Sequence, residues 1–425
     1  MKDKVLHIAA HLGGGAGKAI SGLAIGLNEY VHNKVILLEE PEQDRYVRAC
    51  RENSIDVIIS RDEEVLKREI SLADYVIFSW WGHPLSYEIY KVLSKVEARI
   101  FLWSHVNGLY YPYISPRFLE LFDGVMFTSG CTYENSKWSG EERDIWRKKT
   151  EIIYGIGGFV PAAIQTKPSY NIGDKYMLCY SGTVNYSKMN KEFPRLCEKL
   201  KKDIPSVDIN IYGKYDEETY ESFTALDDAD DYVHMWGFVD DIECRLCEMD
   251  VYCYPLTDIN FATTENALLE AMAAGLPVVV LDNPAERNII IHEKTGYVAK
   301  NIDEMESYLL KLYSDNRTAK ELGQNAREYV IATYDYHINA KKCVEYIRKY
   351  SYDKKLHNFI SLLGKDPGDN LLFFADCDKD GMKQKLRDKS SDNIFLNDSK
   401  GSPYHFIKYY KEDNILKELC GERDI

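Results

Sequence analysis

A polar turn that runs into a helix and a buried strand is the segment of this chain whose residue types best suit chemistry. Residues 262–282, ATTENALLEAMAAGLPVVVLD, predict a helix that is opened by Thr263, Thr264, Glu265 and Asn266. The first amide groups of a helix have no partners within the helix and carry partial positive charge, which favours a phosphate. We therefore expect a phosphate-binding site at this helix start.

The rest of the run indicates where that helix start lies. Ala267 and Glu270 follow the opening residues, apolar side chains share one face, and Gly275 can end the helix in a left-handed conformation. An apolar strand follows Pro277. Because open α/β sheets bind ligands at the carboxyl ends of their strands, the helix start and Glu270 are expected at such an edge.

This run resembles the second-domain signature of the family 4 retaining glycosyltransferases, which have the GT-B fold. The signature is a Glu, seven residues, a second Glu, and then a sequence similar to AMAAGLPVV. The resemblance implies that Glu270, at the second position, binds the ribose of a nucleotide-sugar donor. The first Glu, which in the family contacts the donor's phosphate or transferred sugar, is Ala262 here. Whether Glu265 takes over that role is left open by the sequence.

A second segment, at the start of the second series of strands, is similar to a phosphate-binding loop of the same family. In YSGTVNYSKMNK, Lys188 stands at the family's Lys position counted from Gly182, whereas the usual Arg is Thr183. A cation suits this place, because negative charge accumulates on a departing nucleoside diphosphate. The resemblance implies that Lys188 meets that charge, and an ordinary surface lysine is the alternative.

A glycine-rich turn, HLGGGAGKA, follows the first predicted strand and runs into a helix through Gly13, Gly14, Gly15 and Gly17. It lacks the spacing of a Walker loop and of a dinucleotide-binding fingerprint, although Glu39 at the end of the second strand keeps nicotinamide binding open. A turn that only packs a strand on a helix is the structural alternative. The resemblance places this loop beside the donor phosphates and the acceptor.

Polar and aromatic residues follow two more first-domain strands. His105 comes directly after a strand in LWSHVNG, and Asn107 follows two residues later. His83 and Trp81 follow the preceding strand in SWWGHP, where the indole can stack on a sugar face or a lipid. Satisfied loop residues are the alternative for both histidines. The resemblance implies a histidine near the transferred sugar at position 105 and an acceptor in this domain.

Composition limits the classes of partner. The chain has 425 residues and a formal charge of −15, which disfavours nucleic acid as a partner. Residues 1–150 hold 19 Lys and Arg against 21 Asp and Glu, so the remainder carries −13, and a contact with an anionic membrane should use the first domain. With no long apolar stretch and ten scattered cysteines, a cytoplasmic protein with reduced thiols is expected, peripheral to the inner membrane face if membrane-associated.

Apolar strand runs alternate with helical stretches in two series, which is typical of parallel sheets flanked by helices. The first series lies at residues 5–10, 35–38, 57–59, 75–78, 100–103, 125–128 and 152–154. The second lies at residues 176–181, 208–212, 233–236, 251–255 and 277–281. The predicted fold class is α/β, with two doubly wound Rossmann-like domains that face a central cleft.

Four segments are expected along the chain. Residues 1–165 form an acceptor-side domain, residues 166–335 a nucleotide-sugar domain, residues 336–351 a crossover helix back to the first domain, and residues 352–425 a small appendage of unassigned purpose. The WSGEERDIWRKK segment is interpreted as a solvated helix, with membrane contact as the alternative. DCDKDGMKQKLRD lacks the final Glu of a calcium loop, so no metal site is predicted.

The resulting hypothesis is a retaining glycosyltransferase of the hexosyltransferase type that acts in bacterial polysaccharide or glycoconjugate synthesis. Its catalytic residues would be Lys188, His105 and Glu265, and its sugar or acceptor contacts His83, Trp81 and Asn107. Its donor contacts would be Gly14, Gly15, Gly17, Gly182, Thr183, Thr263, Thr264, Asn266, Ala267 and Glu270. A UDP- or GDP-sugar would be the co-substrate, with no separate cofactor, and a carbohydrate or lipid-linked molecule the acceptor.

Two other functions stay open at this point. A nucleotide-sugar epimerase can have the same architecture without a separate acceptor. A non-catalytic subunit that binds a nucleotide sugar or glycan is the second alternative, since Ala262 and Thr183 depart from the signature.

Overall fold

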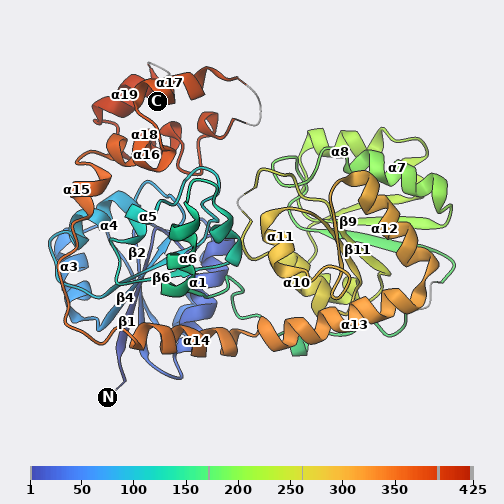
Figure 1. The fold of residues 1–425 in the computed structure, drawn as a ribbon, viewed down its shortest axis with the longest axis horizontal. Coiled ribbons are helices and arrows are strands. Elements are labelled where there is room, and N and C mark those ends of the chain that lie inside the picture. Colours follow the sequence, from blue (N-terminus) through green and yellow to red (C-terminus); the bar gives the residue numbers. More distant parts are fainter. Residues whose placement is uncertain (1, 171–172, 261, 390–392, 422–425) are drawn as a thin grey trace. The chain divides into compact units, whose positions relative to one another are not determined.

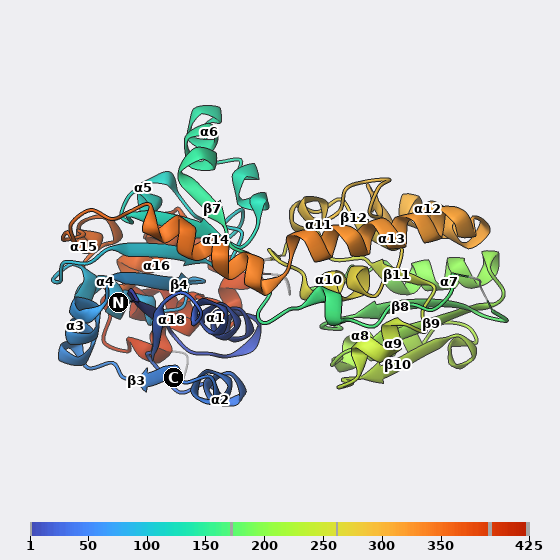
Figure 2. The same ribbon diagram turned by 90° about the horizontal axis from the view of Figure 1, so that it is seen from below.

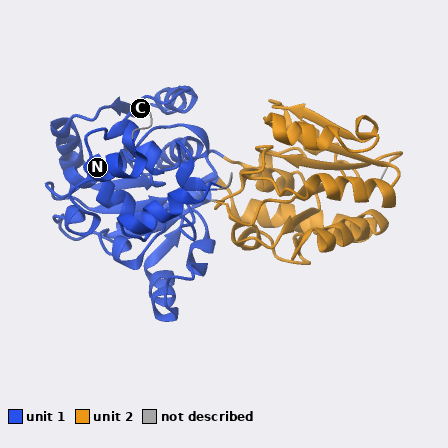
Figure 3. Cartoon of the chain, turned by 90° about the horizontal axis from the view of Figure 1, so that it is seen from above, with its two compact units in different colours: residues 1–158, 336–425 blue, residues 159–335 orange. Residues whose placement is uncertain are grey.

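The computed structural model describes residues 2–170, 173–260, 262–389 and 393–421. The chain forms two compact units, shown in different colours in Figure 3. The first unit consists of residues 1–158 and 336–425, and the second of residues 159–335. The sequence-based division placed the change between domains at residue 165, a few residues later.

The first unit contains a seven-stranded parallel sheet in the order β3-β2-β1-β4-β5-β6-β7. Its strands are β1 Lys4–Ala9, β2 His32–Leu37, β3 Asp56–Ile59, β4 Tyr75–Trp80, β5 Ile100–Ser104, β6 Gly124–Phe127 and β7 Thr150–Ile152. Every residue of β4 and β5 is buried, as expected for central strands covered on both faces. The strand order reverses between β1 and β4, so this is the switch point at which doubly wound sheets bind ligands.

Helices cover both faces of this sheet and form its cores. They are α1 Gly14–Leu27, α2 Arg45–Glu52, α3 Glu63–Leu72, α4 Ser86–Leu93, α5 Pro116–Leu119, α6 Gly140–Lys149 and α14 Tyr336–Arg348. Helix α14 lies beside α1 (Figure 2), and apolar side chains of both helices belong to one buried cluster under β1, β4 and β5. The last third of the chain is therefore needed to complete the core of the first unit.

The C-terminal segment is helical and packs on the first unit, at the top of Figure 1. It contains α15 Phe359–Leu363, α16 Pro367–Ala375, α17 Lys379–Arg387, α18 Pro403–Tyr409 and α19 Asn414–Cys420. His357 connects the segment to the loops that precede β5 and β6. Its ring is within hydrogen-bonding distance of the carbonyl oxygens of Leu121 (2.8 Å) and Ala98 (3.1 Å). Rings of α15 and α16 pack against buried aromatic residues of the first unit, including Tyr90 with Phe359 and Trp80 with Phe374.

The second unit contains a six-stranded parallel sheet in the order β10-β9-β8-β11-β12-β13. The strands are β8 Tyr176–Ser181, β9 Val207–Tyr212, β10 Val233–Gly237, β11 Val251–Tyr254, β12 Val278–Leu281 and β13 Tyr297–Ala299. The helices are α7 Phe193–Asp203, α8 Glu217–Thr224, α9 Ile242–Leu246, α10 Asn266–Ala273, α11 Pro284–Ile289, α12 Ile302–Ser314 and α13 Asn316–Thr333. Here the order reverses between β8 and β11.

The expectation of two doubly wound α/β sheets is confirmed. Each predicted strand corresponds to an observed one, with ends that differ by up to three residues. The three-residue strand β13 was not predicted, because it is too short to form a distinct apolar run. The helix predicted after Thr263 begins instead at Asn266, so Thr263 and Thr264 belong to the preceding loop.

The structure also bears on two possible contacts with a membrane, through the segment around α6 and through a spanning helix. Helix α6 carries the expected charged surface, but Trp138 before it and Trp146 within it are buried, so these two indoles are not available to a membrane surface. Among the described residues, no helix combines the length and apolar composition needed to span a bilayer.

A close approach of α1 to the loop after β7 gives a stability test. A Cβ atom at Gly22 would lie 2.1 Å from the carbonyl carbon of Gly157, whereas a Cβ at Gly15, near the start of the same helix, meets nothing within 4 Å. Gly22→Ala should therefore lower the free energy of unfolding by about 1–3 kcal/mol, because the backbone must move. Gly15→Ala should change it by less than about 1 kcal/mol. Chemical denaturation of both variants checks this, and equal effects would contradict the packing.

Candidate functional site

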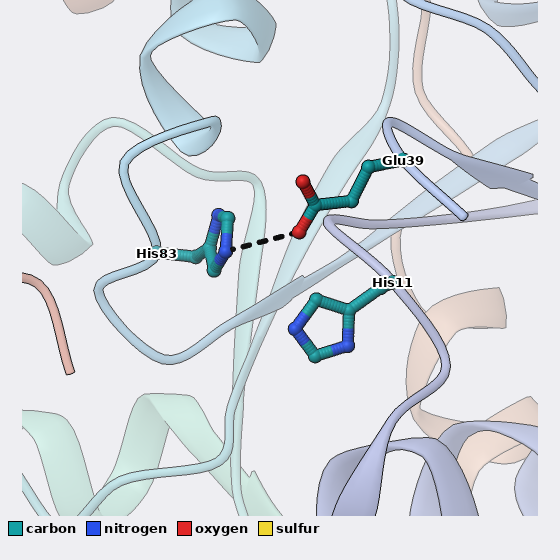
Figure 4. A group of neighbouring side chains, drawn as sticks. All are labelled: His11, Glu39 and His83. Atoms are coloured by element: carbon teal, nitrogen blue, oxygen red, sulfur yellow. Dashed lines mark ion pairs between the residues drawn. The ribbon is translucent and has the colours of Figure 1, made fainter. Parts of the chain in front are cut away.

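A cluster of polar and aromatic side chains lies at the switch point of the first unit. His11 follows β1, Glu39 follows β2, and Trp81 and His83 follow β4. Figure 4 shows His11, Glu39 and His83 close together. The His11 ring centroid is 5.4 Å from those of both Trp81 and His83, with edge-to-face geometry. His105, which follows β5, joins the cluster through Trp81 at 6.0 Å. Four strand ends thus bring together His83, Trp81 and His105 with the previously unassigned His11.

Glu39 is the charged centre of this cluster, which we call the switch-point cluster. His83 Nε2 lies 3.3 Å from Glu39 Oε1, and the hydroxyl of Tyr409 on α18 donates to Oε2 at 2.9 Å. Arg61 adds a longer contact of 3.5 Å to Oε2. Burial alone would raise the pKa of Glu39, but the hydrogen bonds from His83 and Tyr409 and the nearby imidazole charges lower it overall. Glu39 is therefore a carboxylate at neutral pH.

Backbone hydrogen bonds fix which ring nitrogen carries the proton in His11 and in His83. The Gly13 amide donates to His11 Nδ1 at 2.9 Å, and the Leu85 amide donates to His83 Nδ1 at 3.2 Å. Each Nδ1 must therefore hold a lone pair, which leaves the proton of the neutral ring on Nε2. His83 Nε2–H accordingly donates to Glu39, and His11 presents Nε2–H as a donor.

The same geometry bears on metal binding. His11, Glu39 and His83 offer ligand atoms that lie within 4.8 Å of one another, a donor set that zinc accepts. A metal-bound imidazole uses a lone pair on one nitrogen and usually donates from the other. Here the second nitrogen accepts a backbone amide in both rings, so the residues do not fit a metal ion.

The remaining first-unit candidates differ in environment. His105 Nε2 is enclosed without a hydrogen-bond partner among the described residues, and burial lowers the pKa of this ring to about 3. The ring is thus neutral, and it lies 4.4 Å from the ring of Trp103. Asn107 is buried, and its Oδ1 accepts the amide of Leu109 at 3.0 Å, which gives it a role in shaping the loop.

The glycine loop leaves the start of α1 open. Gly13 at the N-cap supplies no side chain, and the first turn of α1 contains no acidic residue. Gly14 and Gly15 are exposed, and Gly14 has a φ of 56°, which favours glycine. A Cβ at Gly17 would lie 2.5 Å from the carbonyl carbon of Leu12, so this glycine is needed for the turn itself.

A second cluster lies at the carboxyl ends of β8 and β11 in the second unit. The ammonium of Lys188 is 2.9 Å from Glu265 Oε2, which also accepts the Tyr254 hydroxyl at 2.5 Å. Burial raises the pKa of Glu265, but the charge of Lys188 and these two hydrogen bonds outweigh it and lower the pKa overall. The side chain of Lys188 stays 29% exposed, so the pair is only partly shielded from solvent.

Glu265 stands at the N-cap of α10, yet its side chain makes no capping bond. Its carboxylate turns to Lys188 and Tyr254 instead, which leaves the helix start without a side-chain cap. Partly buried residues line the loop before α10 and its first turns: Thr263, Thr264, Asn266, Ala267 and Glu270. Glu270 lies close enough to Tyr252 that its charge adds to burial in raising the pKa of that hydroxyl.

The loop after β8 has the tight backbone expected of a glycine turn. Gly182 has a φ of 142°, and a Cβ at Gly213 would lie 1.7 Å from the Gly182 carbonyl oxygen. Thr183 is exposed, and its carbonyl accepts the Tyr180 hydroxyl at 2.8 Å. Tyr180 in turn stacks on Tyr254 at 5.4 Å, which connects this loop to the Lys188–Glu265 pair.

Glu286, on α11, is a fully buried carboxyl group beside this second cluster. Its Oε1 accepts from Asn283 at 3.0 Å, and its Oε2 has no hydrogen-bond partner among the described residues. Burial raises the pKa of Glu286 to about 8, the Asn283 bond opposes this, and the charge of Glu265 adds to it. One cation, Lys188, thus serves two buried carboxyl groups, and Glu286 keeps its proton at neutral pH.

Three participants were missed by sequence reasoning. His11 could have been found, because it lies between the end of the first strand and the glycine loop. Tyr254, the last residue of β11, lay inside the strand predicted at residues 251–255, and its position there indicated only a buried apolar residue. Tyr409 lies 370 positions from its partner Glu39, and no local pattern relates them.

Comparison with known proteins connects the second cluster with a family. Residues 175–315 match the family model described as glycosyl transferases group 1. A Bacillus subtilis (strain 168) protein named "Putative glycosyltransferase EpsD" is 27% identical over 198 residues, which cover 42% of this chain and 50% of that protein. The chain thus aligns with about half the length of this curated relative.

Solved structures resemble the fold over most of the chain. HepE of Anabaena, in complex with UDP and glucose, has a TM-score of 0.64 at 14% identity and covers 82% of this chain and 100% of its own. A glycosyltransferase of Rickettsia africae ESF-5 has a TM-score of 0.66 at 14% identity, with 82% and 98% covered. These likenesses show that the two Rossmann-like units have the fold of GT-B glycosyltransferases, while a cleft between the units stays a prediction.

The Lys188–Glu265 pair gives a test by substitution. Lys188→Met leaves the buried Glu265 carboxylate without its cation and should cost about 1–3 kcal/mol of unfolding free energy, less than a fully buried pair because Lys188 is partly solvated. Adding Glu265→Gln should recover part of that loss. Lys202→Met, which breaks an exposed pair with Glu198, should cost under about 1 kcal/mol. Denaturant titration of these proteins and of Glu265→Gln alone would refute the pairing if the losses of the two single variants simply add in the double variant.

The protonated Glu286 predicts a pH effect. Its pKa is about 8 in the folded state against an ordinary value of 4.5, so between these pH values the folded chain holds a proton that the unfolded chain releases. Unfolding free energy therefore falls as pH rises through this window. Glu286→Gln should remove that penalty and gain stability relative to wild type, by about 1–4 kcal/mol at pH 8. Glu321→Gln, exposed on α13, keeps Glu286 and is the control: its unfolding free energy should follow that of the wild type across this window.

Proposed function

We propose that this chain is a retaining glycosyltransferase that transfers a hexose from a UDP- or GDP-sugar to a carbohydrate or lipid-linked acceptor. The family match over residues 175–315, which contain Lys188, Glu265 and Glu270, supports the transferase activity. UDP and glucose in the HepE complex support a UDP-sugar as the first donor to test. Synthesis of a bacterial surface polysaccharide or glycoconjugate, at the cytoplasmic face of the membrane when the acceptor is lipid-linked, is the proposed setting.

The observation that carries the proposal is the Lys188 ammonium beside the uncapped start of α10. The departing nucleoside diphosphate gains charge as the glycosidic bond breaks, and a fixed cation with oriented amides stabilises it. Glu265 takes one of the three N–H donors of Lys188 at 2.9 Å, and the others can bind phosphate oxygens. The ion pair therefore orients Lys188 without occupying it.

The same geometry suggests how the chain functions with Ala262. Glu265 is held on the Lys188 side by Tyr254, so a carboxylate reaches the phosphate-binding loop although the first signature Glu is absent. In this proposal Glu265 replaces that Glu by positioning the cation. Gly182, Thr183, Thr263, Thr264, Asn266 and Ala267 line the donor site, and Glu270 binds the ribose hydroxyls.

The first unit would bind the acceptor. His83, Trp81 and His105 lie together at its switch point, where a sugar ring can stack on the partly exposed indole and hydrogen-bond to polar groups. His105 is neutral, so it would act as a hydrogen-bonding group near the transferred sugar. With retention, the acceptor adds to the face that the diphosphate leaves, and a departing phosphate oxygen takes the acceptor proton.

The activity is tested first by ligand. Thermal-shift measurements with UDP, GDP and ADP should show stabilisation by one nucleoside diphosphate, and donor consumption should then require an acceptor. A change in the sugar of the nucleotide donor without any acceptor would identify an epimerase instead. Binding without turnover of any donor would identify a non-catalytic binding subunit.

Glu270 is the sharpest single position for the donor. Glu270→Ala should weaken nucleotide affinity by about tenfold to a hundredfold, because hydrogen bonds from ribose hydroxyls to a carboxylate are lost. Folding should be little changed, since this side chain is only partly buried. Glu321→Ala, exposed on α13, is the matched control and should bind normally. Calorimetric titration decides, and unchanged affinity in a folded Glu270 variant removes the assigned role.

A further inference from the structure

Helix α18 of the C-terminal segment packs directly on the switch-point cluster of the first unit. The ring centroids of His405 and Tyr409 lie 4.9 Å and 5.4 Å from that of His83. Just before α18, a Cβ at Gly401 would lie 2.5 Å from the carbonyl oxygen of Gly82. This close backbone approach holds α18 against the loop that carries Trp81 and His83.

Glu39 keeps one accepting position after these contacts are counted. Its Oε2 accepts from Tyr409 at 2.9 Å and from Arg61 at 3.5 Å, and its Oε1 accepts from His83 at 3.3 Å. Each carboxylate oxygen can accept two hydrogen bonds, so Oε1 can take another donor. The side chain of Glu39 is 20% exposed, which leaves it accessible to a small ligand group.

His11 supplies the complementary donor. Its Nδ1 is occupied by the Gly13 amide, and its Nε2–H has no hydrogen-bond partner among the described residues. One ligand atom each of His11, Glu39 and His83 lies within 4.8 Å of the others (Figure 4). A single hydroxyl oxygen with two hydrogen bonds of about 2.8 Å can bridge such a gap. It would accept from His11 and donate to Glu39.

A flat apolar surface lies next to this donor and acceptor. The ring of Trp81 is partly exposed and contacts the His11 ring at 5.4 Å. A carboxylate, an N–H donor and an indole face are the groups that bind a sugar, which carries hydroxyls on its edge and C–H groups on its face.

We propose that His11 and Glu39 form a binding site for a hydroxyl group of a sugar, and that Tyr409 of the C-terminal segment is the positioning residue of this site. Tyr409 holds Oε2, so that the carboxylate presents Oε1 toward His11 and His83. As an acceptor site this rests on the proposed function. The C-terminal segment thereby takes part in acceptor binding.

The first experiment measures the site without any catalysis. In NMR spectra of isotope-labelled histidine side chains, assigned with His11→Gln and His83→Gln, neutral His11 and His83 should show Nε2–H tautomers. The His11 signal of the full-length chain should shift on titration with at least one of three probes: the methyl glycosides of glucose, galactose and N-acetylglucosamine. An Nδ1–H tautomer, stoichiometric zinc bound through these residues, or no shift with any probe would overturn the site.

The second experiment assigns the role of Tyr409. Tyr409→Phe should weaken the probe that shifts His11 by about tenfold, because Glu39 loses a charge-assisted hydrogen bond that fixes it. Tyr410→Phe is the matched control: it also removes a hydroxyl between α18 and the first unit, here donated to the Pro84 carbonyl at 3.2 Å, and should leave the probe affinity unchanged. Equal losses in both variants would reduce Tyr409 to a docking contact.

The readouts separate this inference from the proposed function. Wild-type protein that binds no nucleoside diphosphate would refute the glycosyltransferase proposal, whereas the His11 signal reports the hydroxyl site independently. If a donor and acceptor pair is found, Tyr409→Phe should raise the acceptor KM by about tenfold and leave donor affinity unchanged.

Discussion

Each unit of this protein keeps one ionised carboxylate partly or fully out of water at the carboxyl edge of its sheet, and each carboxylate must be compensated. Burial of an uncompensated charge is costly, so the surrounding chain has to bring donors to it. Glu265 receives Lys188 and Tyr254, and Glu39 receives His83 and Tyr409. In both cases a tyrosine hydroxyl and a basic side chain hold the carboxylate in place. The positions of the loops that carry these side chains depend on that arrangement.

The compensation also decides which groups stay available. Glu265 holds Lys188, whose side chain stays 29% exposed, and because the Glu265 carboxylate turns to this pair the start of α10 has no side-chain cap. In the first unit, backbone amides donate to Nδ1 of His11 and of His83, so the Nε2 atoms of these two rings offer protons instead of lone pairs. The proposed phosphate-binding loop and the proposed hydroxyl-binding cluster therefore both depend on a compensated carboxylate.

Local patterns in the sequence predict much of this structure, because strands of a parallel sheet are continuous apolar runs and their ends carry the polar residues. The strand at residues 176–181, the glycine turn before α1 and the spacing of Lys188 from Gly182 were all found in this way. Short elements without such a run were not, and β13 with its three residues is the example. The start of α10 was placed too early because Thr263 and Thr264 have the polarity of capping residues but lie in the loop.

Partners distant in the sequence could not be predicted, since no periodicity connects Glu265 with Lys188 or Glu39 with Tyr409.

The placement of α14 and α18 has a consequence for biosynthesis. The first unit is assembled from residues at both ends of the chain, so a nascent chain that has released only its first 158 residues lacks both its last core helix and the hydroxyl that Glu39 requires. On the ribosome the second unit can therefore complete its fold before the first unit, although the first unit contains the start of the chain.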